Sequence, residues 1–195
     1  IHNIAWGKNV WTDPLSKDEV KRSKQKHHNF YHVVETLIKT LEKRFGGCVV
    51  YDIHSYNYQR EGQTPDLPLF NIGTSNIDAQ KYRPFINDWL KQLEAISIDS
   101  IQTRSAENEV FYGNGHLLKH ITSTFKKTLV LATEIKKVYC NENTGDEYPE
   151  IIDALRSGIK SAIITNAAKF IREQTKVTFK SKFYLLHSEL DKQVY

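Results

Sequence analysis

The 195-residue sequence contains no methionine and only two cysteines, Cys48 and Cys140. Cysteines so few and so far apart form neither a disulfide framework nor a zinc knuckle, so a reducing cytoplasm is the expected location. The absence of a signal peptide or lipidation motif at either end favours the same compartment. A chain that begins at Ile1 without methionine cannot show its own initiator, which predicts either an internal fragment or a sequence from which modified methionines were omitted.

Long hydrophobic runs are also absent. No apolar stretch approaches the roughly 20 residues that a transmembrane helix needs, so no membrane partner is expected. The formal net charge is only +4, with basic and acidic residues mixed, which argues against a dedicated nucleic-acid surface. A content of 39% hydrophobic and 26% charged residues, with 5 prolines, is typical of a globular protein with one core. We therefore expect residues 1–195 to form a single domain, and composition leaves the oligomeric state open.

Apolar residues recur at helical spacing in three long stretches, which predict helices at about residues 16–45, 77–93 and 147–173. Ser16 and Glu19 fit a capping box at the start of the first helix, and Gly46 supplies its stop. A shorter helix is expected at residues 117–125. These helices alternate with apolar strands, so the sequence predicts an α/β fold with a central, mixed and mostly parallel sheet between flanking helices.

The strands at residues 48–53 and 129–135 are expected at the centre of the sheet, because no other segments are so uniformly apolar. Isoleucines 96, 98 and 101 predict a further strand, followed by a polar turn at residues 104–109. Residues 70–74 predict a short strand or turn in which Gly73 lets the backbone pass close to another group.

Two ionisable residues, Asp52 and His54, stand at the carboxyl end of the first apolar strand. They are two residues apart, so both side chains leave the same face of the strand. Ligands of open α/β sheets bind at this edge, a neutral imidazole is a natural metal ligand, and a nearby carboxylate can fix its tautomer. The alternative, a histidine satisfied by a backbone carbonyl, is about as well supported by the residues alone.

Glu134 ends the second apolar strand, where a buried carboxylate is costly unless it is paired or catalytic. A histidine and a glutamate at neighbouring strand ends suit metal-assisted hydrolysis, in which the glutamate takes a proton from water. An ion pair of Glu134 with Arg104, Lys136 or Lys137 explains the pattern equally well.

Five blocks of sequence resemble the N-formylglutamate amidohydrolase family, closest to its branch named for flavohaemoglobin expression modulation and a QEGLA motif. The blocks are AWGKNVW (5–11), YDIHSYNYQR (51–60), NIGT (71–74), ENEVFYGNGHL (107–117) and ATEIKKVY (132–139) followed by Thr144-Gly145. The family is similar in fold to the zinc carboxypeptidases. This resemblance implies that His54 is a zinc ligand and that Glu134 is the general base. Asp52, on the same strand face as His54, is the candidate to orient the imidazole.

The resemblance also implies a small acidic N-acyl amino acid as substrate. Arg60, six residues beyond His54, is the candidate cation for its carboxylate, because a guanidinium grips a carboxylate through two parallel hydrogen bonds. Asn57 and Asn108 are further candidates for substrate binding. Neither the family's N-terminal histidine motif nor its DLNR segment stands before Ala5, so the chain offers one zinc ligand rather than three.

Two functions are therefore compatible with the sequence. The first is a zinc-dependent amidohydrolase that hydrolyses the amide of a compound such as N-formylglutamate. The second is a non-catalytic binding or regulatory module that retains the hydrolase fold.

Overall fold

The computed structural model describes residues 2–5, 7–59 and 66–190, and their side chains as far as residue 173. The chain divides into two compact units, residues 1–40 and residues 41–195. Helix α1 (Lys17–Phe45) begins in the first unit and its last residues belong to the second.

The first unit opens with a small antiparallel hairpin of β1 (Ile4–Ala5) and β2 (Lys8–Asn9). Gly7 turns the chain between them with a φ of 73°, a left-handed value that favours glycine. The predicted capping box then starts α1. The Ser16 N–H donates to Glu19 Oε2 over 2.8 Å, and the Glu19 N–H donates to Ser16 Oγ over 3.2 Å. Both donors lack partners inside the helix, so the two reciprocal bonds fix where the helix begins.

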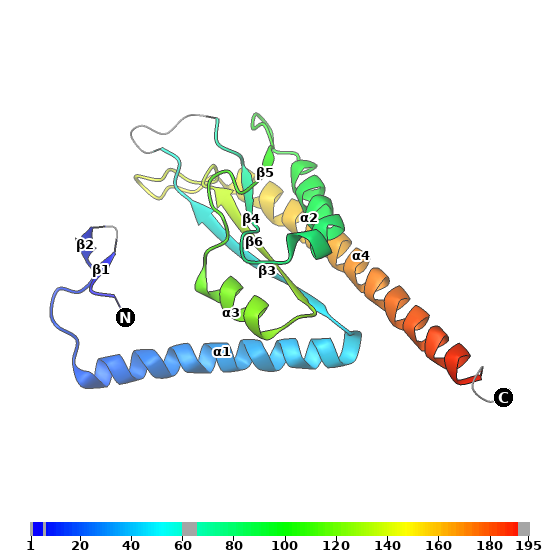
Figure 1. Cartoon of the computed structure of the whole chain (residues 1–195). Coiled ribbons are helices and arrows are strands. Elements are labelled where there is room, and N and C mark those ends of the chain that lie inside the picture. The colour runs from blue at the N-terminus through cyan, green and yellow to red at the C-terminus, as the bar shows by residue number, and fades with distance from the viewer. Residues whose placement is uncertain (1, 6, 60–65, 191–195) are drawn as a thin grey trace. The chain divides into compact units, whose positions relative to one another are not determined.

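The second unit is built on a four-stranded sheet in the order β3-β6-β4-β5 (Figure 1). Its strands are β3 (Cys48–Tyr56), β4 (Phe70–Gly73), β5 (Ser105–Glu107) and β6 (Thr128–Lys136). β3 is parallel to β6, β6 is antiparallel to β4, and β4 is parallel to β5. The predicted α/β class with a mixed, mostly parallel sheet is confirmed.

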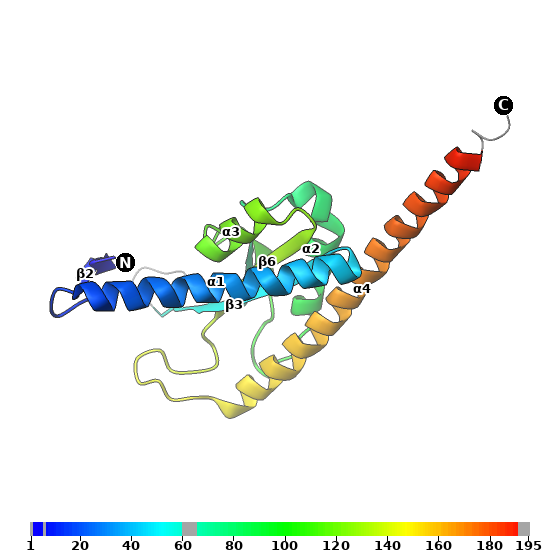
Figure 2. The same cartoon turned by 90° about the horizontal axis from the view of Figure 1, so that it is seen from below.

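Three helices of this unit flank the sheet: α2 (Ala79–Glu94), α3 (His116–Thr124) and α4 (Pro149–Leu190). α2 and α4 pack against each other and enclose the main core with one face of the sheet, whereas α3 lies on β6 (Figures 1 and 2). Gly158 of α4 allows the close packing in that core, because a Cβ there would lie 2.5 Å from a methyl carbon of Ile96. Among the described residues, no helix combines the length and the apolarity of a membrane-spanning segment.

Strand β6 shows how the two faces of the sheet differ. Leu129, Leu131 and Ile135 belong to the core beneath α2 and α4. Ala132 and Glu134, which alternate with them, line a cavity instead. Because side chains alternate along a strand, the apolar residues that anchor β6 in the core also direct Glu134 to the opposite face.

The prediction that β3 is a central strand buried on both faces is wrong. In the described part of the sheet β3 is an edge strand paired only with β6, and Ile53 is 37% exposed. The prediction for residues 129–135 is confirmed, since β6 lies between β3 and β4. A high content of apolar residues indicates that one face of a strand packs in the core, and Tyr51 of β3 does contact Trp89 there. It does not indicate how many strands pair with that strand.

The predicted strand at residues 96–101 is also wrong, and β5 forms where a polar turn was expected. Ile98 and Ile101 form a single bridge in the connection after α2, and the buried Ile96 and Ile98 fill the core. β5 pairs through its backbone with β4 at the other edge of the sheet, and its half-buried polar side chains bind neighbours: Ser105 donates to the Leu90 carbonyl, and Glu107 accepts from Arg83. Helix α4 extends beyond its predicted end at residue 173 as far as Leu190.

The core assignment can be tested with a matched pair of leucines. Leu131 is fully buried, so Leu131→Ala should lower the free energy of unfolding by about 2–5 kcal/mol in urea denaturation. Leu37 is 58% exposed, and Leu37→Ala should change it by no more than about 0.5 kcal/mol. Equal losses in the two variants would contradict this description of the core.

Candidate functional site

His54 and Glu134 are direct neighbours on the two parallel strands. The register of β3 and β6 places His54 opposite Glu134 and Asp52 opposite Ala132. All four residues line a cavity of about 360 Å³ near the carboxyl ends of both strands. The predicted convergence of His54 and Glu134 on one cleft is therefore confirmed, and their chemical roles stay predictions.

Asp52 holds the imidazole of His54. Its Oδ1 lies 2.8 Å from His54 Nε2, and its side chain is only 14% exposed, against 59% for His54. A carboxylate on Nε2 favours the tautomer with the proton on that nitrogen, which leaves the lone pair on Nδ1. No hydrogen bond to a described residue engages Nδ1, so this nitrogen is available to a metal or a substrate.

Glu134 is half-buried, and burial raises the pKa of its carboxyl group. The nearby His54 opposes this rise, and the charge of Asp52 adds to it. A carboxylate with a raised pKa is a stronger base than an exposed one. The ion pair with Arg104 does not form, because that guanidinium binds Glu109 over 2.7 and 2.8 Å.

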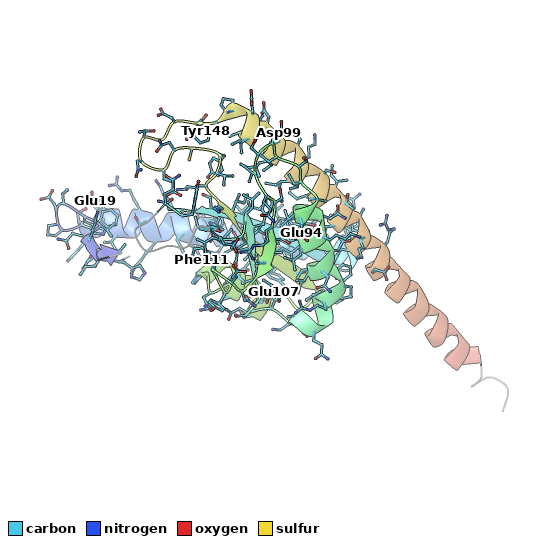
Figure 3. All side chains as sticks on the ribbon, turned by 90° about the horizontal axis from the view of Figure 1, so that it is seen from above. Glu19, Glu94, Asp99, Glu107, Phe111 and Tyr148 are labelled. Carbon is cyan, nitrogen blue, oxygen red and sulfur yellow. The ribbon has the colours of Figure 1, made fainter. Side chains whose placement is uncertain are left out.

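The wall of the cavity is a loop, residues 109–115, that Asn71 of β4 holds in place. Asn71 is fully buried. Its Oδ1 accepts the backbone N–H groups of Glu109 and Val110 over 3.0 and 2.9 Å, and its Nδ2 donates to the Phe111 carbonyl over 2.8 Å. Three bonds from one buried amide fix the backbone beside the cavity, where Phe111 follows β5 (Figure 3).

Two glycines let this wall lie directly against β4. A Cβ on Gly73 would stand 2.1 Å from the Gly113 nitrogen, and a Cβ on Gly113 would stand 2.6 Å from the Gly73 oxygen. Gly113 also has a φ of 77°. The predicted close backbone approach at Gly73 is thus confirmed, and its partner is Gly113.

Two other predicted residues, Asn57 and Asn108, are not among the residues that line the cavity. Both ends of the Asn108 amide bind Thr74: Oδ1 accepts the Thr74 N–H over 2.9 Å and Nδ2 donates to Thr74 Oγ1 over 2.8 Å. Asn57 is half-buried in the segment after β3 and does not line the cavity. Arg60 lies outside the described residues. Substrate binding by these three residues stays a prediction.

Sequence reasoning did not assign a role to Asn71 or Gly113, nor to the aromatic rings of Phe111 and Tyr112. These two rings line the cavity and are 39% and 53% exposed. Asn71 carried a signal, because an amide inside the apolar run 69–72 must find buried partners. The sequence gives no indication that those partners lie 38 to 40 residues further on.

The donor groups of the site fit a zinc ion only in part. His54, backed by Asp52, has the arrangement of a metal-ligating histidine. A catalytic zinc takes three protein ligands, and no group of three His, Cys, Asp or Glu side chains that could hold a metal occurs in the described part of the chain. The described residues therefore supply one donor and not a complete set.

The fold and the cavity define an α/β protein in which an imidazole and a carboxylate lie side by side on parallel strands. The chain belongs to the N-formylglutamate amidohydrolase family, whose model matches residues 1–140. No curated protein matches the sequence.

A solved structure has the same fold: the N-formylglutamate amidohydrolase from Ralstonia eutropha JMP134, with a TM-score of 0.65 and 18% sequence identity. The similarity covers 85% of this chain and 58% of that one. At such low identity the likeness concerns the fold. The chain spans less than two thirds of the length of its structural neighbour.

The wall can be tested at its two glycines. Gly73→Ala should destabilise the protein and displace the loop, because the new methyl group would meet backbone atoms. Gly115→Ala is the control, since a Cβ at Gly115 would have nothing within 4 Å. Thermal unfolding and the amide chemical shifts of residues 109–115 report both effects. A fully stable Gly73→Ala protein with unchanged shifts would show that the two backbones are not in contact.

Proposed function

We propose that this chain hydrolyses the amide bond of a small N-acyl amino acid such as N-formylglutamate, with zinc as the metal. The observation that carries the proposal is the pairing of His54 with Glu134 across β3 and β6 in one cavity, with Asp52 on the imidazole. Membership of the amidohydrolase family supports it. Cys48 and Cys140 are free thiols, which suits a reducing cytoplasm as the compartment.

Glu134 is the proposed general base. Its carboxylate takes a proton from the water that attacks the acyl carbon and passes it to the nitrogen of the breaking C–N bond, which releases the acid and the free amine. The raised pKa of Glu134 suits the first step, because it makes the carboxylate a stronger base toward the attacking water.

His54 is the proposed zinc ligand through Nδ1, with Asp52 fixing its tautomer and orientation. Zinc, when bound, supplies a Lewis acid that polarises the amide carbonyl. Because the described side chains offer one donor, the remaining ligands come from groups other than these.

An acidic substrate also needs a cation. No lysine or arginine is among the described residues that line the cavity. Arg83 and Arg104 are already paired, with Glu107 and Glu109 respectively. Arg60 therefore remains the proposed partner of the substrate carboxylate.

A second function rests on the incomplete donor set. A binding module that keeps the amidohydrolase fold would retain the cavity and the Asn71 clamp while hydrolysing nothing. The two functions differ in one measurement, the release of formate from N-formylglutamate by the purified chain with zinc present. No release would favour the binding module.

Substitution separates the proposed base from the proposed ligand. Glu134→Gln should keep bound zinc and lower kcat by about 100-fold or more, since the amide preserves the shape but accepts no proton. His54→Ala should lose zinc and activity together. Metal content by mass spectrometry and formate release provide the two readings. A Glu134→Gln protein with unchanged kcat would remove Glu134 from the mechanism.

Asp52 is proposed to act through His54, and its effect should appear in metal affinity. Asp52→Asn should weaken zinc binding by about 10- to 100-fold in a competition titration. Asp153→Asn is the matched control, because Asp153 is 69% exposed in an ion pair with Arg156 on α4 and does not line the cavity. Equal affinities in the two variants would mean that Asp52 does not support a metal ligand.

A further inference from the structure

One wall of the candidate cavity is tied to β4 and to the turn that follows it. Asn71 of β4 binds residues 109–111 through three hydrogen bonds. Further along the wall, the Ser75 N–H donates to the Tyr112 carbonyl over 2.9 Å, and the Asn76 side chain donates to the next carbonyl of the chain over 2.7 Å. The wall is therefore held at successive points, and the bonds from Asn71 fix the part that contains Phe111.

The ring of Phe111 is held as well as its backbone. It packs edge-on against Tyr56 of β3, with 5.4 Å between the two ring centres. Tyr56 is itself buried, and its hydroxyl donates to the Pro68 carbonyl. Phe111 nevertheless lines the cavity and is 39% exposed. A ring that is held in place and still partly exposed in a cavity is preorganised to contact a ligand.

Asn71 connects this ring to the proposed reacting groups. Asn71 pairs with Glu134 across β4 and β6, and Glu134 pairs with His54 across β6 and β3. Residues directly opposite each other on paired strands share a face of the sheet, so the three side chains form one row. Asn71 is fully buried and is not among the residues that line the cavity. It can therefore affect a ligand only through the wall that it holds.

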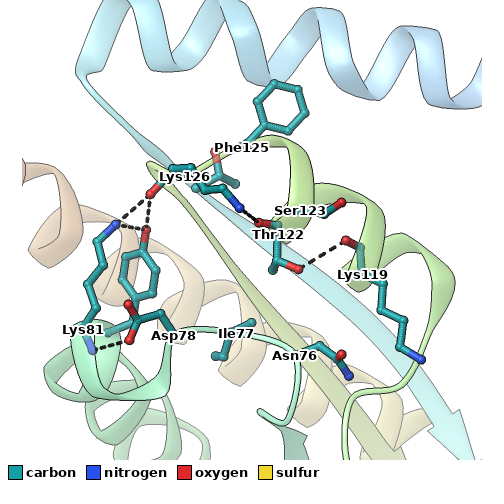
Figure 4. A pocket seen from close by; sticks show the side chains of 11 residues that line it. Asn76, Ile77, Asp78, Lys81, Lys119, Thr122, Ser123, Phe125 and Lys126 are labelled. Atoms are coloured by element: carbon teal, nitrogen blue, oxygen red, sulfur yellow. Dashed lines mark hydrogen bonds between the residues drawn. The ribbon is translucent and has the colours of Figure 1, made fainter.

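The larger cavity between the start of α2 and the end of α3 offers no comparable arrangement (Figure 4). Its lysine side chains do not converge on one point, and the ammonium groups of Lys81 and Lys126 donate to backbone carbonyls. The cavity of His54 and Glu134 remains the candidate ligand site.

We propose that Asn71 is a positioning residue for ligand binding and that it acts through the ring of Phe111. The ring packs against the carbon atoms of the bound N-acyl amino acid, and this contact removes apolar surface from water. Without the three bonds from Asn71, residues 109–111 lose their attachment to β4 and the contact weakens. The proposal rests on the proposed function, in which this cavity binds the N-acyl amino acid.

The test compares two buried amides. Asn166 of α4 is fully buried like Asn71, and it also forms three hydrogen bonds, to Tyr51, Phe85 and Asp88. It does not line the cavity. Asn71→Ala and Asn166→Ala should both lower the unfolding temperature, because each leaves buried polar groups without a partner. Only Asn71→Ala should weaken ligand binding.

Formate release from N-formylglutamate with zinc present gives KM and kcat, and titration calorimetry in a Glu134→Gln background gives Kd without turnover. Asn71→Ala should raise KM and Kd about tenfold and change kcat by less than about threefold, since a contact made equally in the ground and transition states acts on binding. Asn166→Ala should leave all three within about twofold. Hydrogen exchange of the Glu109 and Val110 amides should accelerate in Asn71→Ala alone.

A double variant shows whether Asn71 acts through the ring. Phe111→Ala should raise Kd about tenfold, and Asn71→Ala/Phe111→Ala should bind no more weakly than Phe111→Ala. Because Phe111 is partly exposed, its variant tests the contact even where Asn71→Ala fails to fold. Unchanged binding in Phe111→Ala, additive losses in the double variant, or equal KM values for Asn71→Ala and Asn166→Ala would overturn the proposal.

Failure of the proposed hydrolysis gives a different result. If the unsubstituted chain binds N-formylglutamate and releases no formate, the hydrolysis is wrong, and the Kd values alone decide the role of Asn71. A chain that binds no N-formylglutamate at all would overturn both proposals.

Discussion

The parallel ladder between β3 and β6 is the constraint on which the candidate site depends. It joins nine residue pairs, from Cys48 with Thr128 to Tyr56 with Lys136, and His54 meets Glu134 within it. A shift of one residue would send one of these two side chains to the opposite face of the sheet. A shift of two would separate them by about 6.6 Å along the strands.

Several contacts hold that ladder in register. At its start, Cys48 Sγ lies 3.3 Å from Thr128 Oγ1, which in turn donates to Glu42 of α1. At its end, the Lys137 N–H donates to the Tyr56 carbonyl over 3.0 Å. Between them, Leu131 must lie in the core, where Trp89 also binds Thr133 over 2.9 Å. The packing of the apolar face of β6 in the core thereby fixes the position of Glu134 on the opposite face.

The sequence predicted the parts of the site that lie within single elements. His54, Asp52 and Glu134 stood out because ionisable groups are costly at the ends of apolar strands, and Gly73 because glycine permits close backbone approach. The sequence did not predict the order of the strands or the Asn71 clamp. Both depend on pairing between segments that are distant in sequence, such as β4 with residues 109–111, and local patterns carry no information about such pairing.

The electrostatics of the cavity beside β3 and β6 constrain what it can bind. Asp52 and Glu134 give this cavity two carboxylates beside one imidazole, and none of its described lining residues is a lysine or arginine. Two carboxylates in one cavity would repel an acidic substrate. The same effect acts on Glu134, since the charge of Asp52, in addition to burial, raises the pKa of its carboxyl group. A divalent cation on His54 would bring the formal charge to zero and remove that repulsion. Under the proposed function, a bound metal would therefore aid the binding of an acidic N-acyl amino acid in addition to polarising its amide carbonyl.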